Sequence, residues 1–389
     1  MEFEFWWLIA LPVFFVLGWL AARIDIRHLI SESRALPRSY FRGLNFLLNE
    51  EPDKAIEAFI EVVKVNPETI ELHFALGSLF RRRGETDRAI RMHRNLLERS
   101  DLRAEQRLHA LAELGQDYLK AGFLDRAEET YLRLMKTSLQ AEALRNLLDI
   151  YQLEKDWAKA IATAEGLAKE TGQSWAKEIA NYHCELAAAS VSRSDYETGE
   201  RALEAALAVN PKCVRANLIA GDIALARGDP KEAIARWGRI ETQDPAYLAL
   251  AAQRMVSAFR STDDPAALAT LLRRYLAAYP SLDLLDVVFR STLEIEGAQS
   301  AYALVRDELS RNPTLTGLDH LIEAQLASAP AERHDELKLV KNLVQAQVRR
   351  LARYRCENCG FRARQFYWHC PACGGWETYP PKRGEEFEA

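Results

Sequence analysis

The sequence predicts an all-α fold: a superhelical solenoid of paired helices, with a transmembrane helix before it and a small metal-binding ribbon after it. Three observations predict this order. An uncharged run of 18 residues lies near the start, small residues recur about every 34 residues through the middle, and four of the six cysteines lie in the last 34 residues. The scarcity of Gly and Pro, 18 and 14 of 389 residues, also favours helix.

The first element is an apolar run over residues 5–22, which predicts a transmembrane anchor spanning residues 1–22. As a helix the run reaches about 27 Å, close to the hydrocarbon thickness of a bilayer. Trp6, Trp7 and Trp19 lie near its ends, where indole rings prefer the membrane interface. A cleaved signal peptide is the alternative, but acidic rather than basic residues precede the run and no small-x-small cleavage site follows it.

A basic juxtamembrane connector over residues 23–38 comes next and predicts the orientation. The arginines after the apolar run are Arg23, Arg27, Arg34, Arg38 and Arg42, and no Lys or Arg precedes it. The positive-inside rule therefore places the N-terminus in the periplasm and everything after residue 22 in the cytoplasm. A reducing compartment agrees with cysteines that cluster instead of spreading as a disulfide framework.

Residues 39–333 contain about eight repeats, in each of which a small residue recurs at the same position. We call this residue the rung of its repeat and the series of rungs the ladder. The rungs are Ala55, Ala89, Ala127, Ala160, Gly199, Ala233, Ala267 and Ala301, separated by 34, 38, 33, 39, 34, 34 and 34 residues. Twelve residues before a rung there is often a glycine, four after it an aromatic residue, and twelve after it a proline. These are Gly43, Gly77, Gly115 and Gly221; Phe59, Tyr131 and Trp237; and Pro67, Pro211, Pro245 and Pro313.

This pattern resembles the tetratricopeptide repeat over about residues 40–330. Small residues let two antiparallel helices approach, the aromatic fills the space beside them, and the proline ends the unit. The segments 50–55, 83–89 and 121–127 read as the turns inside three units, with their aspartates, Asp53, Asp87 and Asp125, able to cap the second helix. A last helix over 334–353 has apolar positions spaced by about 3.5 residues, and we expect it to cap the solenoid.

The C-terminal segment 354–389 predicts the metal ribbon and an acidic tail. Cys356-Glu-Asn-Cys359-Gly and Cys370-Pro-Ala-Cys373-Gly are two knuckles separated by ten residues. Two thiolates of each knuckle can hold one ion, and the glycine allows the tight turn that brings backbone N–H groups toward sulfur. Four thiolates make a closed tetrahedral site for one ion, which resembles a rubredoxin-type zinc ribbon.

Zinc is favoured at Cys356, Cys359, Cys370 and Cys373, although four thiolates also permit iron. A redox dithiol would use one Cys-x-x-Cys in a βαβ setting, which is not present. His369 is surplus to the four ligands, and we expect it at the surface or beside the site.

The ribbon's loop, residues 361–368, interleaves aromatic and basic side chains, so two readings remain open. The aromatics could stack on single-stranded RNA. They could instead pack the ribbon against the last helix or the solenoid, and the acidic chain, with a net charge of −5, favours this reading and no nucleic-acid partner.

Catalytic motifs find no match: the sequence has no P-loop, no Gly-x-Ser-x-Gly and no His-Glu-x-x-His. The other histidines are spread over separate units, and Cys184 and Cys213 are expected to be small packing residues in repeat helices. The sequence therefore does not predict an enzyme.

The three parts in this order resemble the lipopolysaccharide assembly protein B family of Gram-negative inner-membrane proteins over the whole chain. The Phe-Trp-Trp-Leu run (residues 5–8) and the two cysteine knuckles carry the resemblance most specifically. It implies a single-pass inner-membrane adaptor, with its bulk in the cytoplasm, that promotes proteolysis of the lipid A deacetylase by the membrane protease FtsH and so regulates lipopolysaccharide biosynthesis. It also implies contact with other inner-membrane lipopolysaccharide regulatory and assembly proteins, leaves room for a homodimer, and carries only the four cysteines over as site residues. A generic envelope-assembly platform and an RNA-binding membrane protein remain as alternatives.

Overall fold

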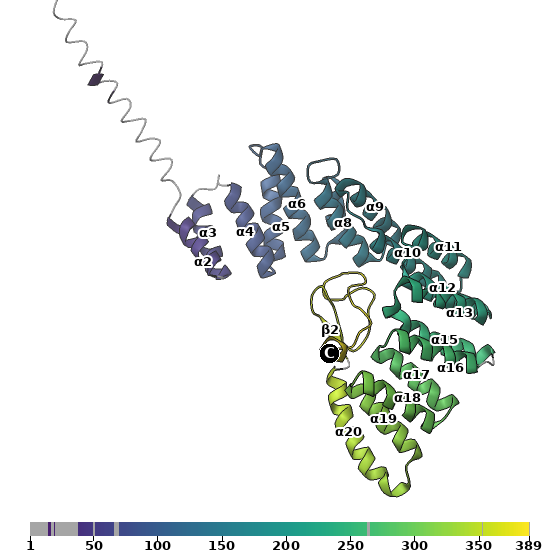
Figure 1. Cartoon of the computed structure of the whole chain (residues 1–389). Coiled ribbons are helices and arrows are strands. Elements are labelled where there is room, and N and C mark those ends of the chain that lie inside the picture. The colour runs from purple at the N-terminus through teal and green to yellow at the C-terminus, as the bar shows by residue number, and fades with distance from the viewer. Residues whose placement is uncertain are drawn as a thin grey trace, which may run out of the picture. The chain divides into compact units, whose positions relative to one another are not determined.

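The computed structural model describes residues 15–16, 19, 38–49, 51–65, 70–262, 265–351 and 353–388. These residues fall into two compact units, Met1–Glu154 and Lys155–Ala389, each of which is a stack of helices (Figure 1). The apolar run over 5–22 lies, apart from three residues, outside the described part of the chain. Among the helices that are described, none combines the length and the apolar character needed to cross a membrane.

The first unit is built from seven described helices that pair in chain order. They are α2 (Arg38–Leu48), α3 (Pro52–Val65), α4 (Ile70–Arg83), α5 (Thr86–Leu97), α6 (Ala104–Ala121), α7 (Leu124–Leu132) and α8 (Gln140–Glu154). Helix α6 is 18 residues long, which accounts for part of the longer step in the sequence ladder at this point.

The second unit continues the same arrangement and ends in the ribbon. Its longer helices are α9 (Trp157–Thr171), α10 (Ala176–Val191), α11 (Tyr196–Val209), α12 (Val214–Ala226), α13 (Pro230–Gly238), α15 (Leu248–Thr262), α16 (Pro265–Ala278), α17 (Leu282–Ile295), α18 (Ala298–Arg311), α19 (Leu315–Ser328) and α20 (His334–Leu351). Short elements complete it: α14 (Ile240–Gln243), η1 (Pro245–Tyr247), η2 (Ala331–Arg333) and α21 (Glu385–Glu388).

Within a pair, a glycine of the first helix faces a ring of the second, sixteen residues later. A Cβ added to Gly43, Gly77, Gly115 or Gly221 would lie within 2.3–2.7 Å of the ring of Phe59, His93, Tyr131 or Trp237, respectively. The rings therefore fill the space in their own pair that the missing side chain leaves open. His93 takes the aromatic position in its unit, where the sequence pattern did not single it out.

The predicted rungs all lie in the second helices, and seven of the eight are buried. The exception is Ala267 in α16, which is exposed, whereas the next residue, Leu268, is buried. The expected register is therefore wrong by one residue at this rung. The physical reason is that α16 buries large side chains such as Leu272 and Tyr275 instead of a small residue.

The three predicted caps are wrong, because Asp53, Asp87 and Asp125 each lie inside the first turn of their helix and not at its N-cap. Asp87 and Asp125 lie inside the first turns of α5 and α7, where a carboxylate still favours the positive end of the helix dipole, but the N-cap residues are Glu85 and Phe123. Aspartate does cap three later second helices by accepting a backbone N–H bond; the pairs are Asp156 with Lys159, Asp195 with Thr198, and Asp229 with Glu232.

Helix α20 packs against α19, and no rung of the ladder marks this further helix pair. The apolar positions that the sequence spaces by about 3.5 residues along α20 are not all buried. Leu337 is buried, Val344 and Val348 are half-buried, and Val340 is exposed. Beyond α20 the chain forms the ribbon, in which β1 (Tyr354–Arg355) pairs antiparallel with β2 (Arg362–Ala363).

The ribbon lies beside the helices of its own unit (Figure 1). Its register pairs Tyr354 with Ala363 and Arg355 with Arg362. An isolated bridge between Tyr354 and Arg383 brings the tail back to β1. The first and last residues of the ribbon are thus held together.

Candidate metal centre and its docking face

The two cysteine knuckles adopt the same backbone turn. Gly360 and Gly374 have φ values of 74° and 68°, in the left-handed region that glycine occupies without strain. Each glycine N–H donates to the carbonyl of the first cysteine of its knuckle, at 2.9 Å in both cases. The Cys-x-x-Cys-Gly pattern therefore folds as two equivalent loops that present paired sulfur atoms.

The loops bring all four predicted ligands together. The Sγ atoms of Cys356, Cys359, Cys370 and Cys373 lie within 4.8 Å of one another. Two of the separations, Cys356 to Cys373 and Cys359 to Cys370, are 3.8 Å. A tetrahedron with metal–sulfur bonds of about 2.3 Å has edges of about 3.8 Å, so the donor set fits a single tetrahedral ion. The four cysteines form a rubredoxin-like metal-binding site.

Hydrogen bonds lower the pKa of two of the four thiols, Cys356 and Cys373, and so favour the thiolate form at these two ligands. Burial opposes ionisation of Cys356, yet the hydrogen bond between its sulfur and the Thr378 hydroxyl, together with bonds from backbone N–H groups, lowers its pKa to about 6. The Asn358 amide donates to Cys373 at 3.4 Å and is the main cause of a lowered pKa there. Cys356 and Cys370 are buried, whereas Cys359 and Cys373 are exposed.

An aromatic surface of the ribbon docks on the repeats. Trp368 stacks on Tyr247 with ring centroids 5.2 Å apart and planes 6° from parallel, and Phe366 meets the same tyrosine edge-on. Trp376 packs edge-on against Tyr182 at 5.7 Å and Trp157 at 6.2 Å. The loop aromatics therefore contact η1, and Trp376, which follows the loop, contacts α9 and α10; these contacts support the docking reading over RNA stacking.

A largely buried arginine lies beside these rings. The Arg215 guanidinium, at the start of α12, is within 6 Å of the ring centroids of both Trp368 and Trp376. It also forms an ion pair of 2.7 Å with Glu185 of α10. A guanidinium suits this position because its flat faces stack on indole while its edge donates to a carboxylate.

Polar contacts surround the aromatic ones. Glu377, with φ of 52°, accepts a 2.8 Å hydrogen bond from the Asn181 amide of α10, and its burial raises the carboxyl pKa. Asp283, in the first turn of α17, binds two ribbon side chains at once. It accepts from the Tyr354 hydroxyl at 2.6 Å and from Arg383 Nε at 2.7 Å.

The acidic tail caps two repeat helices. Glu385 accepts from the backbone N–H groups of Leu315 and Thr316 and from the Thr316 hydroxyl at the start of α19. Glu386 accepts from the N–H of Leu282 at the start of α17. Both carboxylates lie where a helix leaves its first N–H groups unpaired, so the tail belongs to the docking face.

The sequence did not reveal the repeat side of this face. The repeat pattern does not distinguish the residues that contact the ribbon from their neighbours, and their partners lie about 70 to 200 residues away in the chain. These residues are Asn181, Arg215, Tyr247 and Asp283. His369 was expected at the surface or beside the site, and its ring stacks on Trp376 at 4.5 Å. It lies next to the ligand Cys370 and adds to the aromatic contacts.

The two remaining cysteines face each other. Cys184 of α10 and Cys213, the N-cap residue of α12 and so outside the helix interior expected for it, are both buried, with their sulfur atoms 3.8 Å apart. They fill the core between the two helices.

A second group of metal-ligand residue types occurs on α19. One ligand atom each of Asp319, His320 and Glu323 lies within 4.8 Å of the others. The carboxylate of Glu323 already forms an ion pair with Lys341 at 3.0 Å, and the His320 ring stacks on Phe289. These contacts describe a packed histidine beside one carboxylate, that of Glu323, which is already in an ion pair.

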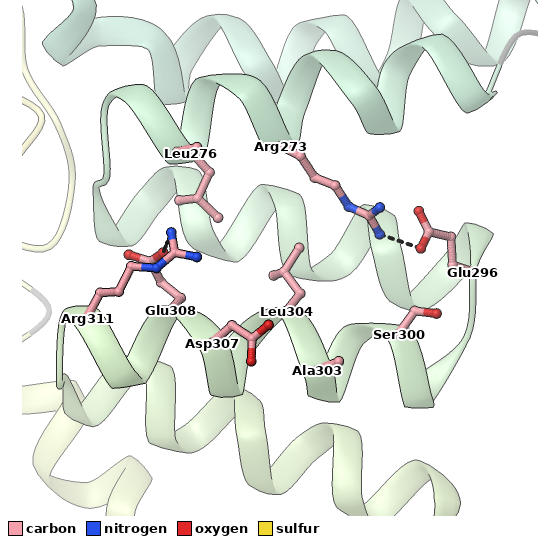
Figure 2. Close-up of a pocket in the computed structure, with 10 residues that line it drawn as sticks. Arg273, Leu276, Glu296, Ser300, Ala303, Leu304, Asp307, Glu308 and Arg311 are labelled. Atoms are coloured by element: carbon pink, nitrogen blue, oxygen red, sulfur yellow. Dashed lines mark hydrogen bonds and ion pairs between the residues drawn. The ribbon is translucent and has the colours of Figure 1, made fainter.

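A hollow of about 480 Å³ lies between α16 and α18 (Figure 2). Its arginines are already matched: Arg273 pairs with Glu296, and Arg311 pairs with Glu308 at 4.0 Å. The hollow therefore lacks the unpaired charges that would select a ligand.

Comparisons with known proteins agree with this architecture. A family model described as "Rubredoxin metal binding domain" matches residues 354–381, and tetratricopeptide-repeat models match 72–108, 112–174 and 184–247. The chain is 34% identical over 378 residues to "Lipopolysaccharide assembly protein B" of Escherichia coli K12, covering 96% of this chain and 97% of that protein. The protein of the same name from Haemophilus influenzae is 31% identical, covering 97% and 98% of the two chains. Among solved structures, a tetratricopeptide repeat protein from Parabacteroides merdae covers 79% of this chain and 100% of its own, at 15% identity and a TM-score of 0.34.

Proposed function

This chain belongs to the lipopolysaccharide assembly protein B family, and on that basis we propose that it is a membrane-anchored adaptor that regulates lipopolysaccharide synthesis through proteolysis. The repeats and ribbon make it an adaptor type of protein, not an enzyme. In the proposed role it presents the lipid A deacetylase to the protease FtsH in the inner membrane. The observation that carries the proposal is the match to the family over 96% of the chain, because it includes both the repeats and the ribbon.

The proposed location follows from the N-terminal sequence. The apolar run over 5–22 would anchor the chain, with its N-terminus in the periplasm and the repeats in the cytoplasm. Anchoring confines the repeats to a layer near the membrane and so raises their effective concentration toward other inner-membrane proteins, including further lipopolysaccharide regulatory and assembly proteins. Stacked repeats offer an extended surface on which a client protein can bind.

We propose zinc as the ion at the four cysteines, with a structural role. Cys356, Cys359, Cys370 and Cys373 would supply all four ligands, which leaves no coordination position open for substrate. Bound metal supplies the cross-link that a ribbon with two very short strands lacks. The residues of the chain then do the rest, since Trp368, Trp376 and the tail carboxylates hold the ribbon on the repeats.

RNA binding by the ribbon is less well supported. A base needs a free aromatic face for stacking, whereas the face of Trp368 is occupied by Tyr247 and the guanidinium of Arg215 lies near its ring. Crosslinking in intact cells separates the two functions. RNA recovered through the ribbon, without any protease or envelope enzyme, would contradict the adaptor role.

The direct test is the lifetime of the deacetylase in cells depleted of this protein. We expect the half-life to lengthen severalfold and to be restored by the full chain but not by a chain that lacks residues 1–22. Inactivating FtsH should lengthen the half-life by itself and abolish any further effect of depletion. An unchanged half-life on depletion would reject the proteolytic role and leave a general envelope-assembly platform.

A further inference from the structure

Helix α20, the last long helix before the ribbon in Figure 1, carries a row of exposed apolar side chains. Leu339, Val340 and Leu343 are 62%, 41% and 64% exposed, respectively. The opposite side of the helix already provides the apolar contact that covers the end of the array, because Leu337 is buried where α20 packs against α19. A helix that only ended the array would need one apolar face, and this helix has two.

The exposed face has the spacing of a coiled-coil seam. Glu336, Leu339, Leu343, Ala346 and Arg350 follow one another at steps of three, four, three and four residues, and all five are exposed. This alternation keeps one narrow stripe facing a partner helix along the whole length of α20. The two leucines lie at the centre of the stripe.

Charges of opposite sign lie at the two ends of the stripe. Asp335 and Glu336 are in the first turn of α20, and Arg349 and Arg350 are in its last turn. None of the four forms an ion pair within the described part of the chain, so their charges are available to a partner. Each charge also complements the helix dipole at its own end.

We propose that α20 pairs antiparallel with α20 of a second copy of this chain. In this arrangement Leu339 and Leu343 of one copy lie over Leu343 and Leu339 of the other. The arginine end of each helix then lies within a turn of the acidic end of its partner. A parallel pair would bring like charges together, which disfavours it. The stripe is thus complementary to itself about a two-fold axis, as an isologous contact requires.

The size of the contact sets the expected strength. Two helices of 18 residues, about 27 Å long, meet along one seam. Such a seam buries less than the roughly 1,200 Å² of a standard stable interface, so we expect a weak dimer with a dissociation constant on the order of 10 µM. Shared confinement to a membrane would raise the paired fraction without any new contact.

Sedimentation equilibrium of the full chain in detergent, over a roughly hundredfold concentration range, tests the proposal. We expect a monomer–dimer equilibrium that the double variant Leu339→Ser/Leu343→Ser weakens by roughly tenfold or more, because each exposed leucine loses its apolar contact. The matched control is Leu153→Ser in α8, which removes a leucine that is 66% exposed and outside the stripe. Circular dichroism checks that all variants keep their helices.

Charge reversal tests the antiparallel geometry. Arg349→Glu/Arg350→Glu should weaken the dimer, and adding Asp335→Lys/Glu336→Lys in the same chain should restore it. Three results would overturn the proposal: a monomer at every concentration, a dimer that the leucine variant leaves unchanged, or no restoration by the fourfold variant. A monomeric chain whose leucine variant loses function in cells would assign the face to a different protein, and this too overturns self-pairing.

Discussion

Replacing Asp283 by alanine should weaken the docking of the ribbon on the repeats without removing its metal. The carboxylate of Asp283 accepts hydrogen bonds from Tyr354 at 2.6 Å and from Arg383 at 2.7 Å. The guanidinium of Arg383 also lies 4.0 Å from the centre of the Tyr354 ring, so the three groups form one cluster that joins α17 to the ribbon. The Asp283→Ala variant loses both hydrogen bonds and the ion pair that Asp283 forms with Arg383.

The size of the effect follows from the number of bonds and their exposure. A hydrogen bond to a charged group contributes about 1.5–3 kcal/mol when it is well buried. The side chains of Asp283 and Arg383 are 20% and 24% exposed, which reduces the contribution of each bond to about 1 kcal/mol. The loss of about 2 kcal/mol should shift the equilibrium between docked and released ribbon by roughly thirtyfold.

Hydrogen exchange measures this shift directly. We expect amides of the tail and of the first turn of α17 to exchange roughly thirtyfold faster in Asp283→Ala, while the metal content stays at the wild-type value. The matched control is Asp307→Ala, because the ion pair of Asp307 with Arg306 is exposed on both sides. That variant should change exchange by less than about threefold. Equal exchange rates in Asp283→Ala and the wild type would show that this cluster does not hold the ribbon.

Three further predictions test the metal site, the helix pairs and the buried carboxylate. Cys356→Ser/Cys370→Ser should abolish metal binding and unfold the ribbon, while the helical circular dichroism signal of the repeats persists. The control variant Cys184→Ser should keep the metal. Metal retention in the first variant would show that the four thiolates are not the ligands. Gly221→Ala should destabilise the second unit by about 1–3 kcal/mol in thermal unfolding, because its Cβ would lie 2.3 Å from Trp237. The control variant Gly238→Ala in α13 meets no atom within 4 Å and should be neutral or stabilising. Equal effects of the two variants on stability would contradict the packing argument. Glu377→Gln should tighten ribbon docking at pH 7, since the amide keeps an acceptor for Asn181 without a buried charge. The difference in docking free energy between the variant and the wild type should shrink as the pH falls through the raised pKa of Glu377, because the wild-type side chain also becomes neutral. A difference that grows on acidification would refute this reading.

The helix pairs and the cysteine site were accessible from the sequence because both are local patterns. A rung, its glycine and its aromatic residue lie within about 16 positions of each other, and each knuckle spans five residues. The ladder misplaced the rung at Ala267 because α16 packs with large side chains, and it passed over His93 because a buried histidine is not an expected aromatic.

The docking face was not accessible in the same way. Asn181 and Glu377 are 196 residues apart, and Asp283 and Arg383 are 100 apart. Neither pair belongs to a periodic stripe, because the contacts depend on where the ribbon folds back and not on the helix period. The sequence predicted only an acidic tail, whereas the carboxylates of its glutamates bind helix N-termini that no sequence rule connects to them.

The contacts of the tail also constrain the order of folding during synthesis. Glu385 and Glu386 follow helices α9 to α20 in the chain, so they are translated after all of these helices. Helices α9 to α19 are complete well before that point, so Tyr182, Tyr247 and the N-termini of α17 and α19 must wait uncovered on the nascent chain. The second unit therefore closes only once the ribbon and its tail have been translated, because the tail carboxylates complete the starts of α17 and α19.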